Sequence, residues 1–196
     1  LSALNSPPNL GVYDAEKPEQ FATNPFQAAW ETPLSYMSRE EDYTNNRFLS
    51  NVFAEVKLFK DLKFRSNLGA DVSNGVYEFY VDPIRTVYGR QNHGVSNHSK
   101  QEYLSWLSEN PLTYSKYFGR NSLTALVGMS VQDNSFGHAY INTKDLPLQY
   151  VKTTNAGNQI EGAGNTKTHS ALVSQFGRII YDYDTKYLLT AALRRD

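Results

Sequence analysis

Histidine, carboxylate and hydroxyl side chains are the groups in this chain that could bind a metal ion or act in catalysis. The chain has four His and no Cys, which excludes a thiolate metal site and a cysteine nucleophile. Only His93 and His98 lie close together, in an irregular stretch and without the spacing of zinc ligands. No G-x-S-x-G or H-E-x-x-H motif occurs. The sequence therefore predicts neither an enzyme nor a bound cofactor.

Two stretches have the composition of a ligand loop without its spacing. Residues 71–75 (DVSNG) resemble the start of a calcium loop, but the acid at the twelfth position would be Asp82, which precedes Pro83. Residues 155–165 (NAGNQIEGAGN) are rich in Gly but lack the Gly-Lys-Ser/Thr ending of a phosphate loop. We expect no metal site at the first stretch and a surface loop at the second.

Aromatic and polar residues in or beside the irregular stretches are candidates for contact with a substrate. They are Tyr80, Tyr88, Arg90, His93, Trp106, Phe136 and Tyr140. Aromatic rings stack on sugar rings and on peptide side chains alike, so both oligosaccharides and peptides remain open as substrates. Such residues more often pack loops than bind ligands.

Charge and hydropathy narrow the class of protein. With 19 basic and 20 acidic residues the net charge is -1, which gives no electrostatic reason to expect nucleic acid as a partner. No stretch approaches the ~20 apolar residues of a membrane-spanning helix. A mean hydropathy of -0.55 does not exclude membrane strands, because they need an apolar residue only at every second position.

Alternation with a period of two marks the segments that should position any site. In residues 51–58 the even positions are Val, Ala, Val and Leu, and in residues 62–72 only Ser66 interrupts the apolar even set. Each pattern is typical of a strand with one apolar and one polar face. Further segments of the same kind follow, with Gln175 as an exception on the apolar side of one of them.

Short and long connections alternate along the chain. Tight turns are expected near residues 60, 120 and 184, and long loops over 82–98 and 133–167. This order predicts an all-β, antiparallel up-and-down meander that forms part of a transmembrane β-barrel, with short periplasmic turns and long extracellular loops. We expect an extracellular loop region over 1–43 and about six barrel strands over 44–196.

Aromatic residues gather near the predicted tight turns, as in an interfacial girdle facing outer-membrane lipid. They are Phe59, Phe64, Tyr114, Tyr117, Phe118, Tyr181, Tyr183 and Tyr187. The polar residues of the same strands are predicted to face the barrel lumen. They are Asn51, Glu55, Lys57, Lys63, Arg65, Asn67, Asp71 and Arg178. In an ordinary sheet they would form a solvated outer face.

Three stretches resemble the barrel of SusC/RagA-like TonB-dependent outer-membrane transporters. They are residues 46–75, 110–130 and, most specifically, FGRIIYDYDTKYLLTAALRRD over 176–196. The resemblance implies a plugged barrel of about 22 strands in the bacterial outer membrane. It also implies TonB as a partner through a plug that this chain lacks, a SusD-like surface lipoprotein as a lid, and import of oligosaccharides or peptides.

Two other classes remain open from the residues alone. One is a secreted β-sandwich that binds carbohydrate through Tyr and Trp, although a sandwich does not require short and long connections to alternate. The other is an assembly or adhesion fragment whose open sheet edges pair with a strand of another chain.

Overall fold

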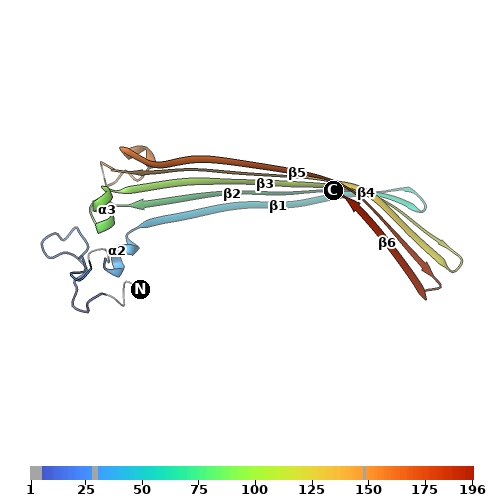
Figure 1. Ribbon diagram of the computed structural model, residues 1–196, viewed down its shortest axis with the longest axis horizontal. Helices are drawn as coiled ribbons and strands as arrows, with labels where there is room; N and C mark the ends of the chain where they lie inside the picture. Colours follow the sequence, from blue (N-terminus) through green and yellow to red (C-terminus); the bar gives the residue numbers. More distant parts are fainter. Residues whose placement is uncertain (1–5, 28–30, 148) are drawn as a thin grey trace. The chain divides into compact units, whose positions relative to one another are not determined.

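The computed structural model describes residues 6–27, 31–147 and 149–196 and is dominated by long strands. The strands are β1 (Glu40–Phe59), β2 (Leu62–Val81), β3 (Val95–Phe118), β4 (Asn121–Lys144), β5 (Gln159–Tyr183) and β6 (Tyr187–Arg195). The helices are α2 (Pro33–Met37), α3 (Val87–Asn92) and the 3-10 helix η1 (Thr154–Ala156). The strands form one six-stranded sheet in chain order (Figure 1), so the predicted all-β meander is confirmed.

The described strands all belong to this one sheet, and in the described part of the chain no second sheet packs against it. The β-sandwich alternative is therefore wrong. No helix in the described residues is long and apolar enough to cross a membrane.

The tight turns lie where the sequence places them. Strands β1 and β2 are joined through Lys60 and Asp61, and β3 and β4 through Gly119 and Arg120. Gly119 has φ +61, a left-handed conformation that glycine adopts without steric cost. Between β5 and β6, Thr185 is left-handed too, and its N–H donates to the Asp182 carboxylate at 2.8 Å.

The long connections are shorter than the sequence indicates. They span 82–94 and 145–158, because β3 begins at Val95, β4 continues to Lys144 and β5 begins at Gln159. The sequence predicts a surface loop over 155–165, but Gly164 lies inside β5, where its lack of a side chain makes room for an aromatic ring. A Cβ there would lie 2.6 Å from the ring of Tyr140. Strand β1 likewise begins earlier than expected, at Glu40.

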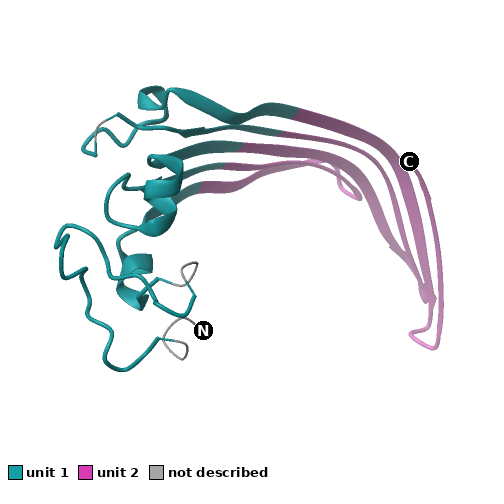
Figure 2. Ribbon diagram, turned by 60° about the vertical axis from the view of Figure 1, so that its left-hand side comes forward, with its two compact units in different colours: residues 1–46, 74–101, 137–166 teal, residues 47–73, 102–136, 167–196 magenta. Residues whose placement is uncertain are grey.

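The chain divides into two compact units (Figure 2). Unit 1 comprises residues 1–46, 74–101 and 137–166, and unit 2 comprises 47–73, 102–136 and 167–196. Unit 1 contains the helices and the long connections, and unit 2 contains the tight turns. The role of residues 1–43 as an extracellular loop region stays a prediction.

The two units differ in what they bury. The buried apolar residues of the described chain are Phe21, Ala22, Tyr80, Val81, Val95 and Leu146, all in unit 1. Unit 2 instead leaves large apolar side chains exposed, such as Val127 at 61% and Leu189 at 67%. Unit 1 thus has a small core of its own, while the apolar side chains of unit 2 need a partner from outside the described residues.

Within unit 2, close packing rather than backbone conformation requires a glycine at position 128. A Cβ on Gly128 would lie 2.6 Å from the ring of Phe176 and 3.1 Å from the Cα of Pro111. Gly69, also inside a strand, would meet nothing closer than 3.9 Å.

We therefore expect Gly128→Val to lower the stability of the full-length protein by about 1–3 kcal/mol, as overpacking does. Gly69→Val is the matched control and should change it little. Urea unfolding followed by intrinsic fluorescence measures both. Equal stability of the two variants would contradict the close packing of β3, β4 and β5 around Gly128.

Candidate functional site

Side-chain contacts between β1 and β2 show which residues share a face of unit 2. Arg47 contacts Asp71, Lys63 contacts Glu55, and the guanidinium of Arg65 lies 4.2 Å from the ring centroid of Phe53. Every contact joins odd-numbered residues. Because side chains of neighbouring strands touch only when they share a face, the odd positions of β1 and β2 form one surface. We call this surface the polar face.

The polar face carries two partly exposed ion pairs. Arg47 donates from Nε and Nη2 to the two carboxylate oxygens of Asp71, at 2.8 and 2.6 Å. Lys63 Nζ lies 3.4 Å from Glu55 Oε1. Arg65 also donates to the Asn67 side chain at 3.0 Å. Exposed pairs of this kind add little to stability, so the arrangement organises a solvent-exposed surface rather than a core.

The polar face extends onto β3 and β4. Ser105 donates to the Asn134 side-chain oxygen at 2.7 Å, and Gln132 donates to the same oxygen at 3.3 Å. A hollow of about 450 Å³ lies here, lined by Leu49, Ser50, Asn51, Gly69, Ala70, Asp71, Ser105, Leu107 and Gln132. Its amide, hydroxyl and carboxylate groups suit a polar ligand or the polar side chains of another protein segment.

The structure brings the predicted lumen-facing residues of β1 and β2 together on the polar face. They are Asn51, Glu55, Lys57, Lys63, Arg65, Asn67 and Asp71. Arg178 lies on β5, two positions from Phe176, whose ring approaches the polar-face side of Gly128. It shares the face without joining the cluster. That this face lines a lumen stays a prediction.

The opposite side of unit 2 carries the large apolar residues, and we call it the apolar face. Its exposed members include Val52, Val56, Leu58, Leu68, Leu104, Val127, Met129, Val173, Ile179, Leu189 and Leu193. They come from all six strands. A contiguous apolar surface of this kind on a sheet whose other side is wet is the pattern expected where strands face lipid.

Two of the predicted substrate contacts, Tyr80 and Arg90, have structural partners in unit 1. Tyr80 is only 5% exposed, and its hydroxyl donates to the carbonyl of Gln149 at 2.5 Å. Strand β2 begins at Leu62 and about 9–11 residues suffice to cross a membrane, so Tyr80 lies beyond that part. Burial raises the pKa of Tyr80 to about 12, with nearby carboxylates adding to the effect. Tyr80 is thus an anchor for residues 145–158, not an open stacking platform.

Arg90 also has structural partners in unit 1, and its contact with a substrate stays a prediction. Its Nη1 donates to the carbonyl oxygens of Ile84 and Arg85, at 3.0 and 3.2 Å, so the guanidinium holds the 82–94 connection together. His93 ends α3 in a left-handed conformation, and its Nδ1 lies 3.5 Å from a carboxylate oxygen of Asp145. That contact joins the two long connections, although the imidazole remains 74% exposed.

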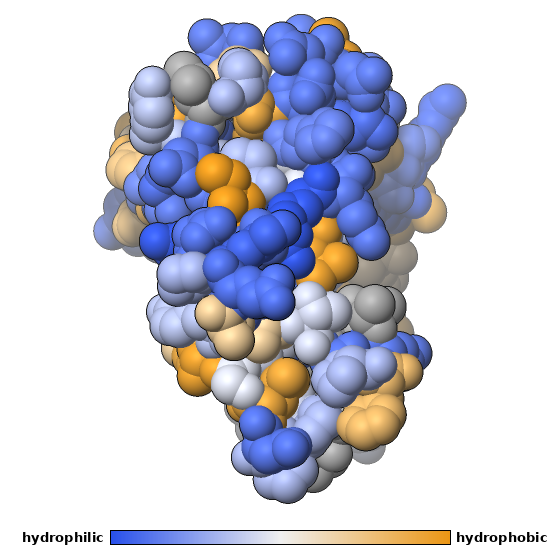
Figure 3. Space-filling view, turned by 90° about the vertical axis from the view of Figure 1, so that its left-hand side faces the viewer, coloured by the Kyte–Doolittle hydropathy of each residue, from blue (hydrophilic) through white to orange (hydrophobic). Residues whose placement is uncertain are grey.

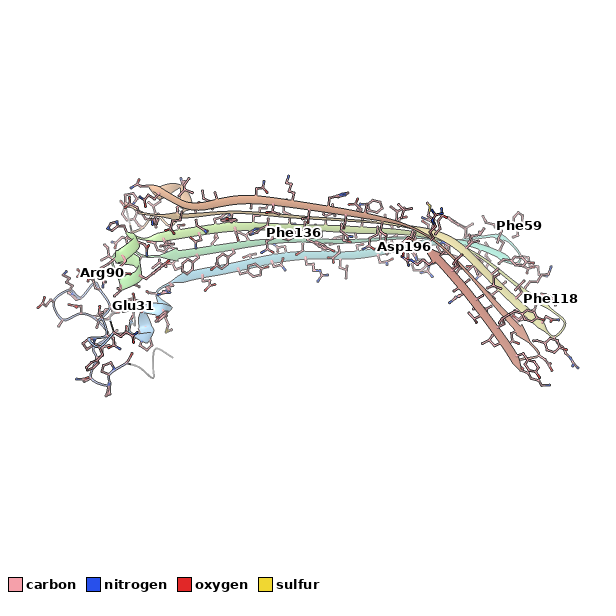
Figure 4. The ribbon with its side chains drawn as sticks, viewed as in Figure 1. Glu31, Phe59, Arg90, Phe118, Phe136 and Asp196 are labelled. Carbon is pink, nitrogen blue, oxygen red and sulfur yellow. The ribbon has the colours of Figure 1, made fainter. Side chains whose placement is uncertain are left out.

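The remaining aromatic candidates divide between the two faces. Trp106 follows Ser105 on β3, so strand alternation places it on the apolar face, away from any polar ligand. Phe136 lies two residues after Asn134 on β4 (Figure 4), which places it on the polar face at 37% exposure. Tyr140 and Tyr88 are exposed within unit 1 at 39% and 40%.

Sequence patterns did not reveal a charged hollow of about 780 Å³ in unit 1. Its lining includes Arg39, Glu40, Glu78, His98 and Lys152. Lys152 Nζ lies 2.6 Å from Glu40 Oε1, and His98 Nδ1 lies 3.4 Å from Glu78 Oε1. These residues come from β1 and the residue before it, from β2 and β3, and from the 145–158 connection, so no local spacing could have indicated the site.

The anchoring role of Tyr80 has a direct test. Tyr80→Phe removes the hydrogen bond to Gln149, worth about 0.5–1.5 kcal/mol, while it keeps the ring in place. We expect faster hydrogen exchange over residues 149–157 in the full-length protein. Tyr88→Phe, at an exposed ring, is the control and should leave exchange there unchanged. Exchange unaltered by Tyr80→Phe would return Tyr80 to the substrate candidates.

Comparison with known proteins shows which proteins contain a segment similar to this chain. No family model matches the chain. The "TonB-dependent receptor P3" of Formosa agariphila is 27% identical over all of this chain, which covers 20% of that protein. The "TonB-dependent receptor P39" of the same organism is 30% identical over 78% of this chain, which covers 15% of its length. The chain thus spans about a fifth or less of these relatives.

Segments of solved structures have the same fold as this chain. The RagAB peptide transporter aligns with 84% of this chain at a TM-score of 0.76 and 17% identity, over 19% of its own chain. The "closed-closed" state of the RagAB peptide importer aligns with 93% at a TM-score of 0.78 and 15% identity, over 21% of its chain. By sequence the chain is similar to segments of two TonB-dependent receptors, and its fold is similar to that of a segment of the RagAB peptide transporter.

Proposed function

We propose that this chain forms part of the wall of an outer-membrane transporter that imports oligosaccharides or peptides at the expense of TonB-delivered energy. The observation that supports this most is the division of unit 2 into a paired, hydrated polar face and an exposed apolar face. A wall between lipid and a water-filled lumen needs such a division, and a soluble enzyme or binding module does not.

Strand length supports the same function. Strand β1 has 20 residues and β5 has 25, whereas about 9–11 residues suffice to cross a membrane. The excess projects into water. Hydrophilic residues predominate on the side of α2 and α3 (Figure 3), which suits the long connections as the extracellular side.

The tight turns suit the periplasmic side. Phe59 and Phe118 end β1 and β3 beside these turns (Figure 4) and are 73% and 45% exposed. Exposed aromatic rings at strand ends are what an interfacial girdle requires. In this orientation the polar face would line the lumen. The polar side chains that line the hollow, such as Asn51 and Asp71, would then form hydrogen bonds with the plug.

A SusD-like surface lipoprotein is the partner that we propose for the extracellular side. One fold relative is described as the RagAB peptide transporter, which favours peptides as one substrate class. The relatives named TonB-dependent receptor do not exclude oligosaccharides. Phe136, Tyr140 and Tyr88 are the candidate contacts that remain accessible, and their rings would stack on either substrate.

Uptake by cells expressing the full-length transporter tests this proposal. Labelled oligopeptides and labelled oligosaccharides are supplied separately, with and without TonB. We expect TonB-dependent uptake of one class. Because an aromatic contact contributes about 0.5–1.5 kcal/mol, Phe136→Ala should lower the initial rate about 2- to 12-fold.

Phe118→Ala, at a tight turn on the other side of the membrane, is the matched control and should leave the initial rate near that of the unchanged protein. Uptake of neither class, or uptake that does not need TonB, would overturn the proposed function. Equal rates for Phe136→Ala and Phe118→Ala would remove Phe136 from the substrate path and leave transport itself standing.

A further inference from the structure

The apolar face of unit 2 is hollowed where small side chains of three strands come together. Ala125 of β4, Gly177 of β5 and Ala191 of β6 line a groove of about 930 Å³. Gly177 is paired with Leu193, and Ile179 with Ala191, so a small residue faces a large one in each pair. The volume lies within the range of about 300–1,000 Å³ that small-molecule sites occupy.

One end of this groove is polar. Asn110, Gln175 and Arg195 line it together with the apolar residues, and Gln175 and Arg195 are cross-strand partners. Gln175 precedes Gly177 on a strand that runs toward a tight turn, and Arg195 follows Leu193 on a strand that runs away from one. The polar end therefore lies on the side of the groove away from the tight turns, and the apolar end lies nearer to them.

The cation at this end needs a counter-charge if the face meets lipid. An Arg on the lipid side of a barrel costs about 2–4 kcal/mol at the membrane midplane and less near the surface. The other polar residues that line the groove are Asn110 and Gln175, which are neutral, and Arg178, a second cation, so no acidic side chain lines it. A phosphate group is a partner that guanidinium binds well, through two parallel hydrogen bonds.

The amide of Asn110 is already engaged. Its oxygen accepts from Ser66 Oγ at 2.7 Å, and its nitrogen donates to Ser108 Oγ at 3.1 Å. These bonds keep Asn110 in place at the edge of the groove. Gln175 and Arg195 are then the side chains available to a ligand headgroup.

We propose that this groove binds a phosphate-bearing membrane lipid, with an acyl chain along Ala125, Gly177 and Ala191 and the phosphate at Arg195. The site is amphipathic in the same sense as the lipid, with charge at one end and an apolar trough at the other. The proposal rests on the membrane placement in the proposed function, and in that orientation the headgroup points toward the extracellular side.

Native mass spectrometry of the delipidated, full-length transporter in detergent tests the site without any transport. The probes are phosphatidylglycerol and a diacylglycerol with the same chains but no phosphate. Arg195→Gln removes the cation, and Gly177→Leu fills the trough; a Cβ at Gly177 meets nothing closer than 3.5 Å, so the fold tolerates the start of a side chain there. Arg194→Gln is the matched control, because Arg194 lies one residue away and bonds Ser174 and Asp196 instead.

We expect phosphatidylglycerol to bind about tenfold more weakly to Arg195→Gln than to the unchanged protein, and Arg194→Gln to bind it normally. Gly177→Leu should weaken the binding of both lipids. Diacylglycerol should bind weakly to every variant, and its binding should not depend on the residue at position 195. Equal occupancy in all variants, or loss of a dimer rather than of lipid in Gly177→Leu, would overturn the site. If the groove binds no lipid but the transporter still shows TonB-dependent uptake, the lipid site is wrong and the transport proposal stands.

Discussion

The organisation of unit 2 depends on the strict alternation of side chains along each strand. Because successive residues point to opposite sides, one run of sequence builds both a charge-paired surface and an apolar one. Arg47 and Asp71 meet on the first, and Val52 and Val56 are exposed on the second. Unit 2 has few buried residues among those described, so its stability depends on what covers the apolar face. A sheet with these two faces suits the boundary between lipid and water that we propose for it.

Unit 1 solves a different physical problem, which is to order long connections outside such an environment. It does so with a small apolar core and with side-chain bonds to backbone carbonyls. Tyr80 holds residues 145–158, and Arg90 holds residues 82–94. The consequence for function is that Tyr80, which is 5% exposed, is little available to a substrate, while the rings of Tyr88 and Tyr140 stay accessible.

Much of the sheet could be predicted because its signals are local. Period-two alternation identified the faces of β1 and β2, and the tight turns followed from where the patterns stop. The signals that failed depend on contacts between distant segments. Gly164 lies in a Gly-rich stretch that predicts a loop, but in the structure it lies in a strand beside the ring of Tyr140. Tyr80 has the residue type of a ligand contact, but its hydroxyl donates to the carbonyl of Gln149.

The two exceptions to the apolar pattern, Ser66 and Gln175, carry information that only the structure reveals. Ser66 bonds Asn110, a residue 44 positions away, and Gln175 lies beside Arg195 at the polar end of a groove. A polar residue in an apolar series therefore marks a specific contact here, not noise in the pattern.

The most direct test of the two-faced wall is to place a fluorescent label at adjacent positions of β1 in the full-length protein. This segment has no Cys, so Asn51→Cys, Val52→Cys, Val56→Cys and Lys57→Cys each add one site within it. In vesicles with brominated acyl chains, we predict strong quenching of the label at 52 and 56 and little at 51 and 57. Quenching that does not alternate between neighbouring positions would contradict a wall with lipid on one face and water on the other.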